Sequence, residues 1–147
     1  MSFLSQILPY KALIIPAAAW LIAQAIKTTI QAIREKHINW YYMISTGGMP
    51  SAHSTLVCAL ATTIGVMYGI DSGLFAISVV LAAIVMHDAA GVRQAVDKQS
   101  AVISNMLLTF PKTHIELEHR MEQLVGHTPF QVAMGALLGV GLALWWV

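Results

Sequence analysis

The sequence predicts an all-α integral membrane protein, a bundle of about four transmembrane helices with one or two amphipathic or surface helices. Hydrophobic residues make up 57% of the 147 positions and charged residues only 10%, whereas soluble domains carry about 25% charged residues. The uncharged residues are also gathered into four long apolar segments. A chain of this length is expected to form one membrane-embedded domain, residues 1–147.

The four apolar segments are the predicted transmembrane helices. A spanning helix needs about 20 apolar residues, with about 17 as the lower limit. The first segment extends toward Ile7 and Ile33, because lysines near helix ends can reach the membrane surface. The "GIDSG" between the second and third is typical of a tight turn, and the tryptophans ending the fourth are typical of an interfacial anchor. The segments are Ala12–Ile26, Thr55–Ile70, Gly73–Met86 and Thr128–Val147.

Two more helices are predicted between the third and fourth spans. Apolar residues recur at helical spacing over Arg93–Phe110, which indicates an amphipathic helix that lies on the membrane or covers the bundle. His114–Leu124 is expected to form a short charged helix. The "AQA" at residues 23–25 resembles a signal-peptide cleavage site, but Lys11 is the only basic residue before it, so cleavage is not expected.

Charge is distributed unequally over the two predicted membrane faces. The net charge of +1 gives no broad basic surface, so nucleic acid is not an expected partner. All six histidines and seven of the eight basic residues fall on one face, which the positive-inside rule places in the cytoplasm. The single cysteine, Cys58, lies in an apolar run and is expected to pack as a small hydrophobic residue.

The segment "GGMPSAHS", residues 47–54, is predicted to start a helix at a candidate anion site. Pro50 stops a preceding helix, and Ser51 is a good N-cap for a helix beginning at Ala52. Unpaired amides and the helix dipole at such a start attract anions, and His53 would face the same anion. The alternative is an ordinary N-cap serine followed by an interfacial histidine.

A second capped start is predicted at "GHTPFQ", residues 126–131. Thr128 at the N-cap, Pro129 at the first helical position and Gln131 at the third form a capping box. His127 then lies just outside the helix, where the positive end of the dipole favours neutral imidazole. Neutral imidazole is the nucleophilic form.

Cations and a histidine–aspartate pair complete the candidate groups. Lys27 and Arg34 are two helical turns apart, about 10 Å along the axis, so they could converge on one polyanion or form a pair at the membrane edge. Arg93 could pair with Asp97 at i+4 or reach the same phosphate. His87 and Asp88 diverge by about 100° on a helix, so no metal site is expected.

The order of these motifs resembles the type-2 phosphatidic acid phosphatases and vanadium-dependent haloperoxidases, and most closely a divergent branch of that superfamily. Lys27 and Arg34 match its Lys-x6-Arg signature, Pro50–His53 ("PSAH") matches Pro-Ser-Gly-His with alanine for glycine, and "GHTP" is similar to its late histidine motif. The resemblance covers about Lys27 to Gly139. Relatives typically have six spans, so a second subunit, in a homo-oligomer, would complete the bundle.

The resemblance implies a role for each matching residue. Lys27, Arg34, Ser51 and nearby amides would bind phosphate, His127 would attack phosphorus, and His53 would protonate the leaving oxygen, with no metal or other cofactor. The family's Ser-Arg before the late histidine is absent, so either Arg93 or Arg120 would supply the third arginine. Gln131 stands where the family has an orienting aspartate.

The expected function is therefore a metal-independent membrane phosphatase acting on a lipid phosphate or lipid pyrophosphate through a phosphohistidine. One alternative is a non-catalytic membrane protein that binds or moves phosphate-bearing lipids, or acts as a scaffold. A minor alternative is a vanadate-dependent haloperoxidase. The expected location is a multi-pass position in the cell membrane, with the polar face toward the cytoplasm.

Overall fold

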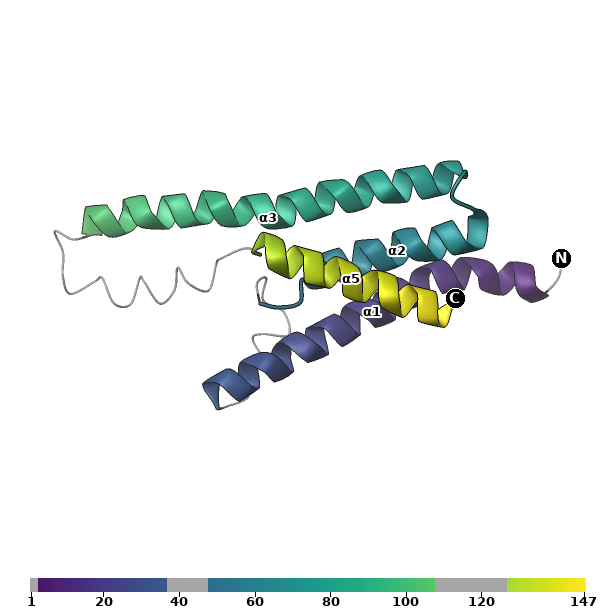
Figure 1. Ribbon diagram of the computed structural model, residues 1–147, viewed down its shortest axis with the longest axis horizontal. Helices are drawn as coiled ribbons and strands as arrows, with labels where there is room; N and C mark the ends of the chain where they lie inside the picture. Colours follow the sequence, from purple (N-terminus) through teal and green to yellow (C-terminus); the bar gives the residue numbers. More distant parts are fainter. Residues whose placement is uncertain (1–2, 37–47, 108–126) are drawn as a thin grey trace.

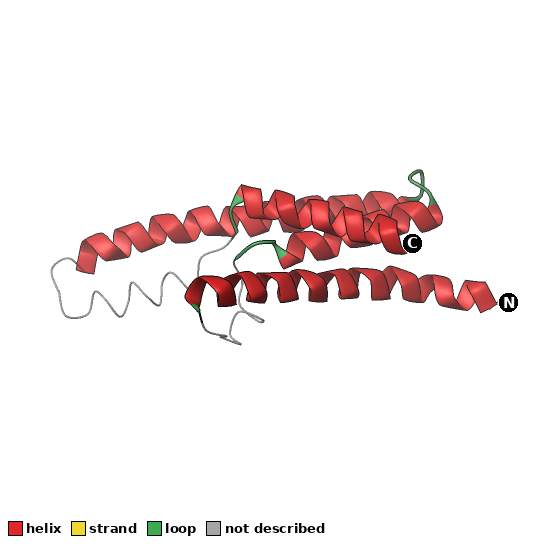
Figure 2. Cartoon of the chain, turned by 60° about the horizontal axis from the view of Figure 1, so that its bottom comes forward, coloured by secondary structure: helices red, strands yellow, loops and turns green. Residues whose placement is uncertain are grey.

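The computed structural model describes residues 3–36, 48–107 and 127–147. Over these ranges the chain is helical and has no strand (Figure 2), which confirms the all-α prediction. The helix predicted over His114–Leu124 lies outside the described residues, as does the end of the amphipathic helix at Phe110. The helices are α1 (Phe3–Glu35), α2 (Ala52–Tyr68), α3 (Gly73–Leu107) and α5 (Pro129–Trp146).

Helix α2 lies at the centre of the bundle and packs against the other three helices. Helices α1 and α3 run antiparallel to α2, whereas α5 runs parallel to it (Figure 1). The N-terminal ends of α2 and α5 therefore meet at one end of the bundle, here called the capped end, which contains Ser51 and Thr128. The opposite end, the turn end, contains the short connection Gly69–Ser72 between α2 and α3.

Two glycines bring α5 into backbone contact with α2. A Cβ atom added at Gly135 would overlap the Ser51 carbonyl, and one at Gly139 would overlap the Thr55 carbonyl. The Thr55 hydroxyl donates a hydrogen bond to the Gly135 carbonyl at 3.0 Å. Such close approach over small residues is how membrane helices commonly associate. Gly141 has open space instead.

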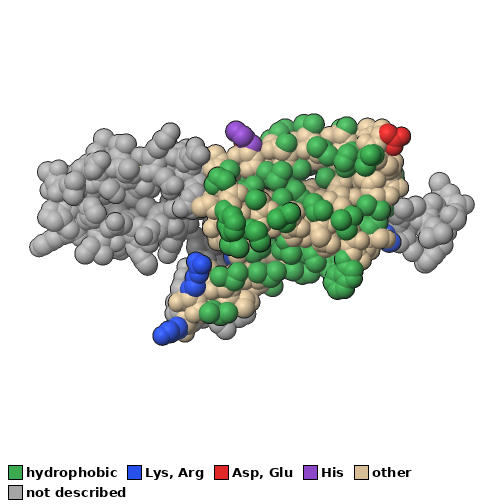
Figure 3. Space-filling model, in the orientation of Figure 1, with side chains coloured by type: hydrophobic (Ala, Val, Ile, Leu, Met, Phe, Trp, Pro, Cys, Tyr) green, Lys and Arg blue, Asp and Glu red, His purple; other side chains and the backbone are tan. Residues whose placement is uncertain are grey.

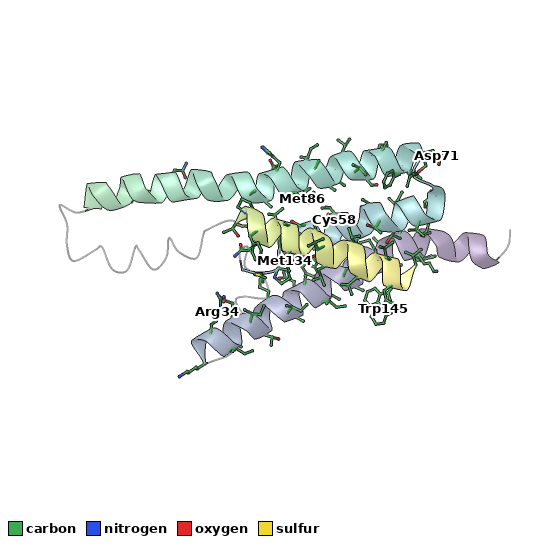
Figure 4. The ribbon with its side chains drawn as sticks, viewed as in Figure 1. Arg34, Cys58, Asp71, Met86, Met134 and Trp145 are labelled. Atoms are coloured by element: carbon green, nitrogen blue, oxygen red, sulfur yellow. The ribbon has the colours of Figure 1, made fainter. Side chains whose placement is uncertain are left out.

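Small apolar residues fill the space around α2. One cluster joins α1, α2 and α5 through Ile15, Ala19, Ala59 and Ala143. Another joins α2 and α3, where the Cys58 sulfur lies 3.6 Å from the Met86 sulfur (Figure 4). Cys58 is buried and packs as the sequence predicts.

Among the residues that the structure describes, three helices are long and apolar enough to cross a membrane, over Tyr10–Arg34, Gly73–Gly91 and Pro129–Trp146. The remaining predicted span, Thr55–Ile70, corresponds to α2, which is apolar but has 17 residues, about 25 Å at 1.5 Å per residue. Large hydrophobic side chains are exposed over the outside of the bundle (Figure 3). This outer surface fits lipid, so the chain is a helical membrane protein. The number of candidate spanning helices is roughly the number predicted.

The predicted boundary between a span ending at Met86 and a separate helix starting at Arg93 is wrong. Residues 73–107 form one continuous helix, and its second half extends beyond the other helices (Figure 1). The Ser72 hydroxyl accepts a hydrogen bond from the Phe75 amide and caps its start. Gly91 does not interrupt the helix, because a single glycine costs a helix only about 1 kcal/mol. The sequence therefore becomes more polar near His87 because the surroundings of the side chains change there, while the backbone remains helical.

Candidate functional site

Helix α2 begins as the sequence predicts, with Ser51 as its N-cap. The buried Ser51 Oγ accepts hydrogen bonds from the Ser54 amide at 3.4 Å and the Ser54 hydroxyl at 3.0 Å. A hydroxyl has two acceptor positions and one hydrogen. With both acceptor positions used, the Ser51 hydroxyl hydrogen is left for a further acceptor.

Some backbone amides at the start of α2 are hydrogen-bonded within the bundle, whereas others are left for the candidate site. The Ser51 amide donates to the Gln131 carbonyl of α5 at 3.1 Å, and the Thr55 amide to the Ser51 carbonyl. Ser54 is capped by the Ser51 hydroxyl. Because amides in the first turn have no partner within the helix, those of Ala52 and His53 are the two that can face a ligand.

Helix α5 begins with the predicted capping box. The Thr128 hydroxyl accepts from the Gln131 amide at 3.2 Å, while the Gln131 Oε1 accepts from the Thr128 amide at 3.0 Å, and Pro129 follows Thr128. The Gln131 side chain therefore stabilises the helix start. Its backbone carbonyl joins the two caps, since it also accepts from the Ser51 amide.

His127 is buried just before α5, with 4% of its surface exposed. Its backbone amide donates to the Ala89 carbonyl of α3 at 3.1 Å. Its ring centroid lies 6.1 Å from that of His53, with an edge-to-face angle of 66°. The His127 Nδ1 atom is buried and has no hydrogen-bond partner among the described residues.

The surroundings of His127 favour its neutral form. Burial lowers the pKa of the imidazole below its ordinary value of 6.5, and the positive charges of His53 and Lys27 lower it further. The Gln131 side chain and the Gly48 backbone act in the opposite direction without reversing the shift. Desolvation disfavours the charged form of a buried base, so His127 is an unprotonated base over a wider pH range than an exposed histidine.

Lys27 enters the same region from α1, with only 2% of its surface exposed. Gly48 covers its stem, since a Cβ atom added there would lie 2.9 Å from the Lys27 Cγ. Gly48 also has a φ of +83°, a conformation that other residues rarely adopt. Lys27, Ser51, His53 and His127 thus come together at the capped end from α1, α2 and the residue before α5.

The three arginines that were also predicted to bind phosphate are not seen beside Lys27. One lies farther away along α1, and the side chains of the other two are not among the described residues. Arg34 is exposed in the last turn of α1 (Figure 4), about 10 Å along the axis from Lys27. Arg93 belongs to α3, one turn after Ala89, but its side chain is outside the described part, and Arg120 lies outside it entirely.

The described residues contain no group of three potential metal ligands. His87 and Asp88 are exposed on α3, with 3.8 Å between the His87 Nδ1 and an Asp88 carboxylate oxygen. They lie on the outer surface of the bundle.

Sequence reasoning missed Gln24, which is buried on α1 one turn before Lys27. It also did not foresee that Gly48 would cover the Lys27 stem. A lone amide within a predicted span was the available signal for Gln24, because polar side chains inside membrane helices usually face the bundle interior.

Residues 8–142 match the Divergent PAP2 family. The chain belongs to this family. This confirms the resemblance inferred from the order of the motifs. The chain is also 40% identical over 138 residues to the "Uncharacterized membrane protein YuiD" of Bacillus subtilis (strain 168), covering 86% of this chain and 87% of that protein. No solved structure matches. The chain is therefore a helical membrane protein of the Divergent PAP2 family.

Proposed function

We propose that the protein is a membrane phosphatase that hydrolyses a lipid phosphate or lipid pyrophosphate at the capped end. The observation that carries this proposal is the burial of Lys27 beside the buried His127, at the capped start of α2. Lys27 brings a positive charge to this end of the bundle, and a positive charge attracts an anion such as a phosphate. The capped end is also where a lipid headgroup would meet the bundle.

In this proposal His127 is the nucleophile. The imidazole lone pair forms a bond to phosphorus while the bond between phosphorus and the lipid oxygen breaks, and His53 gives its proton to that oxygen. Water then attacks phosphorus, the bond to His127 breaks, and His53 takes the proton from the water. The depressed pKa of His127 keeps the lone pair available.

The remaining groups would stabilise charge on the phosphoryl oxygens. Lys27 supplies a positive charge, the Ser51 hydroxyl supplies one hydrogen bond, and the Ala52 and His53 amides supply two more. Phosphoryl transfer depends mainly on such positioning and charge stabilisation. The scheme uses no metal ion.

A non-catalytic protein that binds phosphate-bearing lipids is the second candidate, and the position of Gln131 favours it. The Gln131 oxygen is used by the Thr128 amide, and the His127 Nδ1 has no partner among the described residues. An orienting carboxylate would stabilise the imidazolium formed during catalysis. Gln131 has no charge for this purpose, so binding without turnover would be the result if no other group replaces it.

Phosphate release from a panel of lipid phosphates by purified protein in EDTA separates the two candidates. We expect turnover without divalent metal, inhibition by vanadate and loss of turnover in His127→Ala. His87→Ala is the matched control, because His87 is an exposed histidine on α3. Turnover by His127→Ala equal to that of the wild type would contradict the mechanism. Vanadate binding without turnover of any lipid would support the binding protein.

Arg93 and Arg120 are the candidates for the third phosphate ligand. We expect Arg93→Ala to weaken vanadate inhibition more than Arg120→Ala. Arg93 follows Ala89 by one turn of α3, and the Ala89 carbonyl is bonded to the His127 amide. The opposite order of the two variants would assign the contact to Arg120.

A further inference from the structure

Two polar atoms close to Lys27 are buried without a partner. They are the His127 Nδ1 and the Gln24 Oε1, and neither has a hydrogen bond among the described residues. The His127 atom belongs to the site described above. Gln24 has 6% of its surface exposed and has no role in the proposed mechanism.

Gln24 lies on the same side of α1 as Lys27. Residues three apart on a helix are neighbours on its surface, and both side chains are buried in the bundle. Because α1 runs from the turn end toward the capped end, Gln24 lies deeper than Lys27, by about 4.5 Å along the axis. A lipid phosphate beside Lys27 would have the rest of its molecule on this deeper side.

The neighbouring hydroxyl groups of Ser54 and Thr55 on α2 already have hydrogen-bond partners within the bundle. Thr55 donates its hydroxyl hydrogen toward the carbonyls of Ser51 and Gly135, and Ser54 donates to Ser51. Thr63 also has an unpartnered oxygen, but it lies about 18 Å along α2 from Ser51. Gln24 is therefore the unpartnered group directly below the phosphate position.

We propose that the Gln24 amide is a specificity-determining residue of this site, which hydrogen-bonds a hydroxyl group that the lipid carries beside its phosphoester. This proposal rests on the proposed function, because it places the phosphate at Lys27. A hydroxyl both donates and accepts, so it fits either end of the amide. An unsubstituted hydrocarbon at this position would leave the amide unpaired, and sites that bind a hydroxyl discriminate strongly against ligands without it.

The test compares two lipids that differ by one hydroxyl. They are the phosphonate analogues of 1-oleoyl lysophosphatidic acid and of its 2-deoxy form, chosen because phosphonates resist hydrolysis. Binding to the wild type in detergent should favour the hydroxyl-bearing lipid by about tenfold, the effect of one hydrogen bond. Gln24→Met, which keeps the length and removes both polar atoms, should bind the two lipids equally.

Thr29→Val is the matched control on α1. Thr29 is exposed and its hydroxyl bonds the Ala25 carbonyl, so this variant should keep the tenfold preference. Gln24→Leu is a second apolar replacement. Both Gln24 variants should unfold at the wild-type temperature or above, because they remove a buried amide oxygen that has no hydrogen-bond partner among the described residues.

Several results would overturn the proposal. They are a wild type without preference, a preference that survives in Gln24→Met or Gln24→Leu, and a failure of both variants to fold, which would show that the amide serves the fold. Turnover is measured separately with the natural phosphates. A wild type that discriminates between the phosphonates but hydrolyses no lipid would reject the phosphatase and retain the Gln24 proposal.

Discussion

The rings of His53 and His127 lie 6.1 Å apart, centroid to centroid, although 73 residues separate them in the chain. One ring comes from the first turn of α2 and the other from the residue before the N-cap of α5. The hydrogen bond from the Ser51 amide to the Gln131 carbonyl fixes the two helix starts to each other. The histidine pair therefore depends on how α2 and α5 pack, and not on either segment alone.

The stability of the protein should fall on acidification below about pH 6.5, the ordinary pKa of histidine. The pKa of folded His127 is lowered by burial, so between that lowered value and 6.5 the unfolded chain binds a proton that the folded chain does not. Stability then decreases as pH falls, by at most about 1.4 kcal/mol per pH unit for this group. Thermal unfolding in detergent at neutral and acidic pH measures the effect.

His127→Asn should reduce this pH dependence, because it removes the titrating group. His87→Asn changes an exposed histidine and should leave the dependence as it is in the wild type. An unchanged slope in His127→Asn would show that other groups cause the acid sensitivity.

Replacing Lys27 by methionine should weaken vanadate binding by about 10- to 100-fold, since hydrogen bonds to charged groups contribute about 1.5–3 kcal/mol. Methionine fills a similar volume under Gly48 and removes the charge. Vanadate affinity can be measured by inhibition, or by stabilisation against heat if the protein has no turnover. Lys11→Met is the control at the turn end of α1, and equal affinities in the two variants would exclude Lys27 from the anion site.

Gly135→Ala should separate α5 from α2 and disturb the site without changing any proposed ligand. The new methyl group would overlap the Ser51 carbonyl, and overpacking of this kind typically costs about 1–3 kcal/mol. We expect a lower unfolding temperature and weaker vanadate binding. Gly141→Ala, on the same helix but with open space around it, should be neutral, and a neutral Gly135→Ala would contradict the packing described here.

Cysteine labelling should place the capped end in the cytoplasm. In a Cys58→Ala background, Asp71→Cys at the turn end should react with an impermeant reagent added to intact cells. Lys36→Cys, which follows α1 near the capped end, should react only after the cells are opened. The prediction follows from the excess of basic residues on this face. Labelling of Lys36→Cys from outside would reverse the orientation.

The starts of α2 and α5 could be predicted to the residue, because their signals are local. Ser51 and the set of Thr128, Pro129 and Gln131 each satisfy amides within one turn of themselves. The boundary near Met86 was wrong because polarity changes there while helix propensity does not. A hydrophobic pattern depends both on the backbone conformation and on whether the side chains face lipid, protein or water. In α3 the polarity changes while the backbone conformation does not.

The relationships between segments could not be predicted. Lys27 and Arg34 share one face of a helix by spacing, yet Lys27 is buried and Arg34 is exposed. Gly48 packs against the Lys27 stem, a contact that the spacing of the two cations on α1 could not reveal. The unpartnered Gln24 likewise becomes visible only when its neighbours on the other helices are known.

The hydrogen bond between the His127 amide and the Ala89 carbonyl connects the position of His127 to the position of α3 in the bilayer. We therefore expect the geometry of the site to depend on bilayer thickness. Helix α3 is long and apolar enough to cross a membrane over Gly73–Gly91, and a hydrophobic span that is longer than the membrane is thick adapts by tilting. Tilting of α3 would move Ala89 and, through this bond, His127, whereas Lys27 and Ser51 belong to α1 and the start of α2. We therefore expect lipids of different chain length to change the distance between the proposed nucleophile and the phosphate it would attack.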